Sequence, residues 1–270
     1  MRVMFLGDVV GRSGRQAIER HVPELRRRLA LDFVAVNGEN AAHGFGITAK
    51  ICHAFYQAGV DVITTGNHVW AQPEIREVID DDPRLLRPLN LPPPVPGRGA
   101  GAFETVDGRR VLVIHPMGKL FMVPVEEPFA AVAAELASHR LGAGVDCILV
   151  DIHAEATSEK AAMGHYLDGR VSLVVGSHSH VPTADARILP RGTAFQTDMG
   201  MCGDYDSIIG METEIALDRF LGLGSSRRLE PAKGEATLCG VVVETDDKSG
   251  LARRIEPIVL GGGLKARMPA

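Results

Sequence analysis

The sequence predicts an α/β fold in which two packed sheets are flanked by helices. In the first half of the chain, apolar runs typical of buried strands alternate with helical segments, and the same alternation returns near residues 128–178. The C-terminal third instead contains strand pairs joined by short turns. Alternating strands and helices favour parallel pairing with right-handed crossovers. Both halves supply candidate site residues, so we expect residues 1–270 to form a single domain.

The elements of the first half follow from local patterns. Three apolar runs predict strands, namely Arg2–Leu6, Phe33–Val36 and Val60–Thr65. Helical segments are expected after them, at Gly11–Leu29, Thr48–Ala58 and Gln72–Ile79. Thr48 is a suitable N-cap, because its hydroxyl can accept a hydrogen bond from the first turn.

The middle of the chain breaks this pattern. Arg87–Arg98 is rich in proline, which a helix interior excludes, so we expect an extended connection. Phe103–Val106 and Arg110–His115 flank Asp107-Gly108, a hairpin signal. The alternation then resumes with a helix and two strands, at Pro128–Leu141, Ile148–Ile152 and Val171–Val175.

The C-terminal third is expected to be mainly antiparallel. A short turn joins Arg187–Leu189 to Thr193–Gln196, and a second turn joins Thr237–Thr245 to Ala252–Leu260. We expect the tail after Gly261 to be frayed.

Charge and hydropathy argue against nucleic acids and membranes as binding partners. The net charge is −5, and the basic residues are scattered, which argues against an extended nucleic-acid groove. The densest basic run, Arg26-Arg27-Arg28, is expected on a solvated helix face. No apolar run approaches the roughly 18 residues of a membrane span. Because the N-terminal residues are predicted to enter a strand at once, we expect no signal peptide.

The cysteines favour a reducing cytoplasm. None of the four forms a C-x-x-C pair, and their spacings match no zinc-finger pattern. Cys147 and Cys239 lie in apolar strands and are expected to be buried, whereas Cys202 lies in a glycine-rich turn and is expected to be the most exposed.

Side chains that bind metals or move protons follow five predicted strands. They are Asp8, Glu39, Asn40, Asn67, His68, His153, His178 and His180. The carboxyl ends of parallel strands lie along one sheet edge, where ligands usually bind. We therefore expect these eight side chains to meet there.

The types of these side chains favour a particular chemistry. Carboxylate, amide and imidazole ligands without a thiolate suit manganese, iron or zinc. Seven ligands divided between two ions would leave positions open for water, with Glu39 as the candidate bridge. Two such ions activate a shared water and hold the oxygens of a phosphoryl group. His68, next to Asn67, is then the candidate general acid.

Four motifs resemble those of the calcineurin-like metallophosphoesterases. They are Gly7-Asp8, Gly66-Asn67-His68, His153 and Gly176-Ser177-His178-Ser179-His180. Two positions depart from that family's pattern, because Val10 replaces a usual histidine and Glu39-Asn40 replaces a usual aspartate. With the segment Thr197–Gly203, these departures resemble the YmdB-like branch of the superfamily.

The resemblance implies a four-layer αββα sandwich. It implies one metal ion held by Asp8, Glu39, Asn40 and His180, and another held by Glu39, Asn67, His153 and His178. The branch is associated with iron or manganese and with hydrolysis of 2′,3′-cyclic nucleotides. A bridging hydroxide would attack phosphorus, and His68 would protonate the leaving oxygen.

Each candidate ligand also has a structural interpretation when taken alone. Asp8 could cap a helix, and Asn67 could occupy a left-handed turn. Glu39 could be solvated, and His153 could be a hydrogen-bonded core histidine. His178 and His180 are expected on the same side of an extended segment, because side chains alternate there.

Other residues near the motifs have less defined roles. His43 could contact substrate or be a plain loop residue, whereas His115 and His165 are expected to be structural. Three charged groups could orient metal ligands, namely Glu155, Lys160 and Asp198. Residues 117–128 could form a substrate lid or merely pack.

Two rival functions remain open from the sequence. The protein could be a phosphomonoesterase or nucleotidase, or a regulatory protein that retains the metal site. His68 favours the enzyme. No residue pattern decides whether the chain forms a homo-oligomer.

Overall fold

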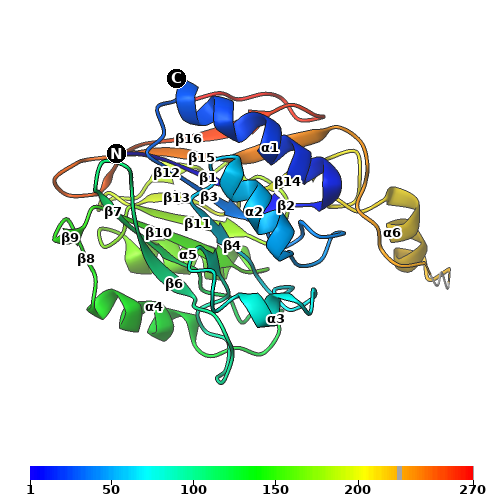
Figure 1. The fold of residues 1–270 in the computed structure, drawn as a ribbon, viewed down its shortest axis with the longest axis horizontal. Coiled ribbons are helices and arrows are strands. Elements are labelled where there is room, and N and C mark those ends of the chain that lie inside the picture. The colour runs from blue at the N-terminus through cyan, green and yellow to red at the C-terminus, as the bar shows by residue number, and fades with distance from the viewer. Residues whose placement is uncertain (224–226, 270) are drawn as a thin grey trace.

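The computed structural model describes residues 1–223 and 227–269, and two sheets dominate this part of the chain (Figure 1). The first sheet has eight strands: β1 (Arg2–Leu6), β2 (Asp8–Val9), β3 (Phe33–Asn37), β4 (Val62–Thr64), β5 (Leu85–Leu86), β14 (Met201–Asp204), β15 (Ala236–Thr245) and β16 (Ala252–Leu260). The second has six: β6 (Ala100–Glu104), β7 (Arg110–Ile114), β10 (Cys147–His153), β11 (Leu173–Ser177), β12 (Arg187–Ile188) and β13 (Ala194–Gln196). The strands β8 (Arg140–Leu141) and β9 (Gly144–Val145) pair separately.

The helices of the described residues lie on the outer faces of the two sheets, except for the last one, which projects outward (Figure 1). They are α1 (Gly11–Arg28), α2 (Ala49–Gln57), α3 (Ile75–Val78), α4 (Pro128–Ala137), α5 (Thr157–Leu167) and α6 (Thr213–Phe220). Figure 1 shows α1 and α2 on one side of the strands and α4 on the opposite side, while α6 projects from the body.

Three apolar cores separate four layers, which confirms the predicted αββα sandwich. Side chains alternate along β1, so Val3 and Phe5 pack between the sheets while Met4 and Leu6 pack against the helices. Ile18 and Val22 of α1 join the outer core of the first sheet. The third core lies between the second sheet and its helices, where β10 meets α4 and α5.

Both sheets are mixed, and their central strands are parallel. In the first, β1, β3, β4 and β5 are parallel, and in the second β7, β10, β11 and β13 are parallel. The antiparallel hairpins β6–β7 and β15–β16 were both predicted. The N-cap expected at Thr48 is also present, since its hydroxyl accepts a hydrogen bond from Ile51.

The C-terminal third differs from its expected form. β13 and β14 each have a parallel partner, in β11 and β2. The helix α6 was not predicted, and α3 is shorter than expected. The tail is not frayed up to residue 269, because Arg267 exchanges backbone hydrogen bonds with Val259 and Met268 packs on the outer core of the first sheet.

Cys202 contradicts its expected exposure. Residues 201–204 form a strand rather than a continuing turn, and Cys202 is fully buried between β2 and β15. The other three thiols are buried and free as well. Among the described residues, no helix combines the length and apolar character that a membrane crossing requires.

Candidate metal centre

The parallel strands of both sheets end at one shared edge. Asp8 follows β1, Glu39 and Asn40 follow β3, and Asn67 and His68 follow β4. The imidazoles come from the second sheet, because His153 ends β10 while His178 and His180 follow β11. The packing of the two sheets therefore brings oxygen ligands from one side against nitrogen ligands from the other.

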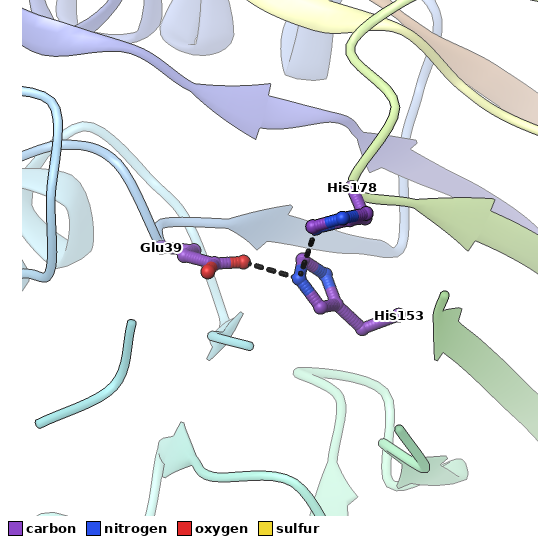
Figure 2. A group of neighbouring side chains, drawn as sticks. All are labelled: Glu39, His153 and His178. Atoms are coloured by element: carbon purple, nitrogen blue, oxygen red, sulfur yellow. Dashed lines mark hydrogen bonds and ion pairs between the residues drawn. The ribbon is translucent and has the colours of Figure 1, made fainter. Parts of the chain in front are cut away.

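One cluster of ligand atoms surrounds His153. Its Nε2 atom lies 2.6 Å from Oε2 of Glu39, 3.0 Å from Oδ1 of Asn67 and 3.2 Å from Nδ1 of His178. Figure 2 shows the Glu39 carboxylate and both imidazoles directed at one another. The ligand atoms of Glu39, His153 and His178 all lie within 4.8 Å of one another, a separation that one cation could span.

A second cluster surrounds His180. Its Nε2 atom lies 3.2 Å from Oδ1 of Asn40 and 3.9 Å from Oδ1 of Asp8. The other ring nitrogen contacts the backbone oxygen of Ile209 at 2.7 Å, which fixes the ring orientation. Asp8 also accepts hydrogen bonds from the backbone N–H of His178, so the clusters share a scaffold.

Glu39 belongs to the first cluster and is buried. Its Oε1 accepts the backbone N–H of His68 at 2.8 Å, and its Oε2 faces Nε2 of His153 at 2.6 Å. Burial would raise the pKa of Glu39, but His153 and the N–H of His68 outweigh it and hold the pKa at about 2. An ionised, buried carboxylate that faces other candidate ligand atoms fits a metal ligand.

The other ionisable groups also suit a bound cation. Burial raises the pKa of Asp8 to about 6, although His180 and His153 act in the opposite direction. Burial and the neighbouring His153 lower the pKa of His178 to about 3, so its imidazole is neutral and can donate a lone pair. A cation would favour the charged form of Asp8.

His153 is held by polar groups that sequence reasoning missed. Ser177 Oγ lies 2.9 Å from its Nδ1 and donates to the buried carboxylate of Asp151 at 2.7 Å. Asn37 and Thr64 also donate to Asp151. The available signal was an aspartate inside the apolar run Cys147–Ile152, where burial requires hydrogen-bond partners.

Asp8, Asn67 and Glu39 do not have the purely structural roles considered for them individually. Asp8 caps no helix, because Val10 is the N-cap of α1. The backbone of Asn67 does not have the positive φ of a left-handed turn, and the side chain of Glu39 is buried rather than solvated. His153 is buried and hydrogen-bonded as a core histidine would be, yet its Nε2 atom faces the other candidate ligands.

The prediction of an extended backbone at His178 and His180 was wrong, although both side chains reach the site. β11 ends at Ser177, and the two histidines have φ values of 93° and 65° instead of extended geometry. They consequently serve different clusters. Left-handed backbone at non-glycine residues is uncommon and concentrates at functional sites.

His68 lies at the rim. Its ring packs edge-on against Phe45 at a centroid distance of 5.0 Å and lines a cavity beside the clusters. His43 is exposed and lines the same cavity. His115 is buried with its Nδ1 3.0 Å from the backbone oxygen of Asp151, and His165 is exposed on α5, as expected for structural histidines.

Two carboxylates near the motifs contact the histidine loop, residues 178–180, and a lysine pairs with one of these carboxylates. Oε2 of Glu155 lies 3.3 Å from Nε2 of His178. Lys160 is fully buried and pairs with Asp198 at 2.6 Å, and Asp198 also accepts both the hydroxyl and the backbone N–H of Ser179. These contacts are those of groups that orient the loop.

The loop at residues 117–128 shows the packing that was one of its two expected behaviours. Met117 is buried and pairs with the backbone of His153, and Glu159 anchors the N–H groups of Lys119 and Leu120. Phe121 is 90% exposed. The first part of the loop therefore packs, and only its tip could contact a substrate.

A four-layer αββα sandwich with carboxylate, amide and imidazole groups at its strand ends is the architecture of the metallophosphoesterases. The family model described as YmdB-like protein matches residues 4–258. The chain therefore belongs to the YmdB-like family, the branch of the calcineurin-like metallophosphoesterases indicated by Val10, Glu39 and Asn40.

Individual proteins agree with this membership. The chain is 46% identical over 260 residues to the 2′,3′-cyclic-nucleotide 2′-phosphodiesterase of Bacillus subtilis (strain 168), covering 96% of this chain and 97% of that protein. A hypothetical protein from Thermus thermophilus has a similar crystal structure, with a TM-score of 0.89, 42% identity, and coverage of 97% of this chain and 100% of that one. A novel phosphatase from Mycoplasma pneumoniae also has a TM-score of 0.89, with 35% identity and coverage of 97% and 93%.

Proposed function

We propose that the protein is a metal-dependent phosphodiesterase that hydrolyses 2′,3′-cyclic nucleotides. The observation that carries the proposal is the convergence of Glu39, Asn67 and His178 on Nε2 of His153 within 3.2 Å. The activity named for the Bacillus subtilis relative supports this substrate class.

Two metal ions are part of the proposal. Asp8, Glu39, Asn40 and His180 would hold one, and Glu39, Asn67, His153 and His178 would hold the other. The grouping of these residues into two clusters supports this division, and the mixed oxygen and nitrogen donors suit iron or manganese, with zinc also compatible. Bound ions of this kind lower the pKa of a water and stabilise charge on phosphoryl oxygens.

The chain's own residues then have distinct roles. We assign the protonation of the leaving oxygen to His68, which lies at the rim and is fixed through its backbone N–H by Glu39. Ser177 and Asp151 hold Nδ1 of His153, so that Nε2 faces the ligand atoms. Burial lowers the pKa of His68, although Glu39 opposes this shift, so the protonated ring is a stronger acid but is less populated at neutral pH.

The domain organisation and the cellular compartment are also part of the proposal. We infer that residues 1–270 act as one domain, because ligands from both sheets complete each cluster. Four buried, unpaired thiols support a reducing cytoplasm.

A substrate comparison tests the proposal. Purified protein supplied with manganese is assayed on 2′,3′-cyclic AMP, 3′,5′-cyclic AMP and AMP, before and after chelation. Hydrolysis of 2′,3′-cyclic AMP that chelation abolishes supports the proposal. Faster release of phosphate from AMP would identify a phosphomonoesterase instead, and a metal-loaded protein inert toward all three would favour a regulatory protein.

A further inference from the structure

A cavity of about 870 Å³ opens beside His68 and is lined mainly by polar and cationic side chains. Those that matter here are Arg12, Arg15, Phe45, His68, Arg228 and Lys233. The whole chain carries a net charge of −5, so a local group of four cations is unusual for this protein. Glu230 is the one carboxylate among the lining residues that the structure describes.

The start of α1 adds to the positive potential of this cavity. Arg12 and Arg15 lie near the N-terminus of this helix of 18 residues, and its first turn contains no acidic residue. The N-cap, Val10, supplies no side-chain hydrogen bond. Helix N-termini favour anions, so two arginines here repel the helix dipole unless an anion is bound.

The arginines of the cavity have no carboxylate partners within the described residues. Lys233 pairs with Glu212 and Glu230, but Arg12, Arg15 and Arg228 form no ion pair in that part of the chain. Burial lowers the pKa of Arg15, Glu19 opposes this shift, and Arg12 adds a smaller lowering effect. A bound anion would relieve this repulsion.

The cavity is also connected to the metal clusters. His68 lines it with its ring and contacts Glu39 with its backbone N–H. The guanidinium of Arg15 donates to the backbone oxygen of Ala41, the residue after Asn40. An anion in the cavity would therefore lie on the same side of the site as the proposed proton donor.

We propose that this cavity binds a second phosphate of the substrate, so that preferred substrates are nucleotides carrying a further phosphate besides the one being hydrolysed. The inference rests on the proposed phosphodiesterase function. Arg12, Arg15 and Arg228 supply guanidinium groups, which bind phosphate through paired charge-assisted hydrogen bonds. The second phosphate belongs either to a 5′-phosphate ester or to the phosphodiester that links a preceding nucleotide.

The test compares kcat/KM for three substrates. They are adenosine 2′,3′-cyclic phosphate, its 5′-phosphorylated form, and the dinucleotide ApA with a terminal 2′,3′-cyclic phosphate. We expect one or both of the larger substrates to be preferred by about tenfold or more, mainly through KM, as for a hydrogen bond to a charged group. Preference for the 5′-phosphorylated mononucleotide alone identifies a monoester ligand, and preference for the dinucleotide identifies the linking phosphodiester.

Variants test whether the arginines of the cavity cause the preference for the larger substrates. Arg12→Ala combined with Arg228→Ala should bring the substrate ratio close to one, whereas Arg20→Ala, exposed further along α1, should leave the ratio as in the wild type. A wild-type ratio near one, with the simple cyclic nucleotide hydrolysed, overturns the inference and leaves the proposed function intact.

A binding measurement covers the case in which no substrate is hydrolysed, which would overturn the proposed function. Isothermal titration then compares adenosine 3′,5′-bisphosphate with adenosine 3′-phosphate. Tighter binding of the bisphosphate that Arg12→Ala weakens supports the second phosphate site. Equal affinities for the two nucleotides refute it.

Discussion

At the scale of single residues, Asn40 explains how the centre tolerates Val10. Val10 has no ligand atom, and its backbone pairs with that of Asn40 at the end of β3. This pairing places the Asn40 amide 3.2 Å from Nε2 of His180. The two departures from the wider superfamily pattern are therefore in direct contact, as expected if one compensates for the other.

His68 provides the sharpest test of a residue role. We predict that His68→Ala retains its metal but loses about 10²–10⁴-fold in turnover, because it removes the acid and no ligand. The measurement is kcat on a substrate with a poor leaving group, alongside metal content. His165→Ala, which removes an exposed histidine on α5, is the matched control. A variant running at the wild-type rate would show that His68 is not the acid.

Gly66 is predicted to be essential because of space. A Cβ atom there would lie 2.0 Å from Oε2 of Glu39 and 2.4 Å from Nε2 of His153. Gly66→Ala should therefore displace these ligands and weaken metal binding by at least about 10-fold. Titration with manganese measures the change, and Gly263→Ala, whose added Cβ meets no atom within 4 Å, serves as control. Unchanged affinity would mean that these ligands do not hold the metal.

The positions of the candidate ligands were predictable from sequence because each follows a strand that has a parallel neighbour. The contacts behind them were not. Ser177 and Asp151 orient His153 only because β10 and β11 are neighbours in register, with His153 opposite Ser177. Linear spacing also gave the wrong conformation for His178 and His180, since it carries no information on where β11 ends.

At the scale of elements, the loop after β11 depends on a buried ion pair between α5 and the segment before β14. Lys160 and Asp198 are buried, and Asp198 also holds Ser179 between the two histidines. We predict that Lys160→Met lowers stability by about 3–5 kcal/mol, because it leaves a buried carboxylate without its partner. Thermal unfolding measures this as a fall in Tm of roughly 6–20 °C.

Two further variants show whether the fall in Tm comes from the unpaired buried carboxylate. Lys248→Met, at an exposed turn, should leave Tm within about 1–2 °C of the wild type. Asp198→Asn added to Lys160→Met should recover part of the loss, because no charge remains buried. An unaltered Tm in Lys160→Met would show that this pair does not hold the loop.

Elements with strong local signals were predicted well, and those that depend on tertiary pairing were not. The strand runs and the Asp107-Gly108 hairpin carry their own patterns. β14 is short and glycine-containing, and it exists through pairing with β2 and β15. The tail after Gly261 is ordered by Val259, a contact that terminal position alone does not reveal.

At the scale of the whole molecule, the centre exists only because the two sheets pack together. The oxygen ligands follow β1, β3 and β4 of the first sheet, and every imidazole ligand belongs to the second. Val3 and Phe5 of β1 lie in the core that joins the sheets. Because Glu39 lies in the proposed ligand sets of both ions, its removal should affect both.

The metal content per chain tests most directly whether the protein binds two ions that share Glu39. The protein is loaded with manganese, desalted and analysed for metal, together with Glu39→Gln and the exposed control Glu214→Gln. The account predicts about two ions per chain in the wild type and the control, and fewer than one in Glu39→Gln, because Glu39 is shared by both ligand sets. A wild type that retains no metal, or a Glu39→Gln variant that retains both ions, would contradict it.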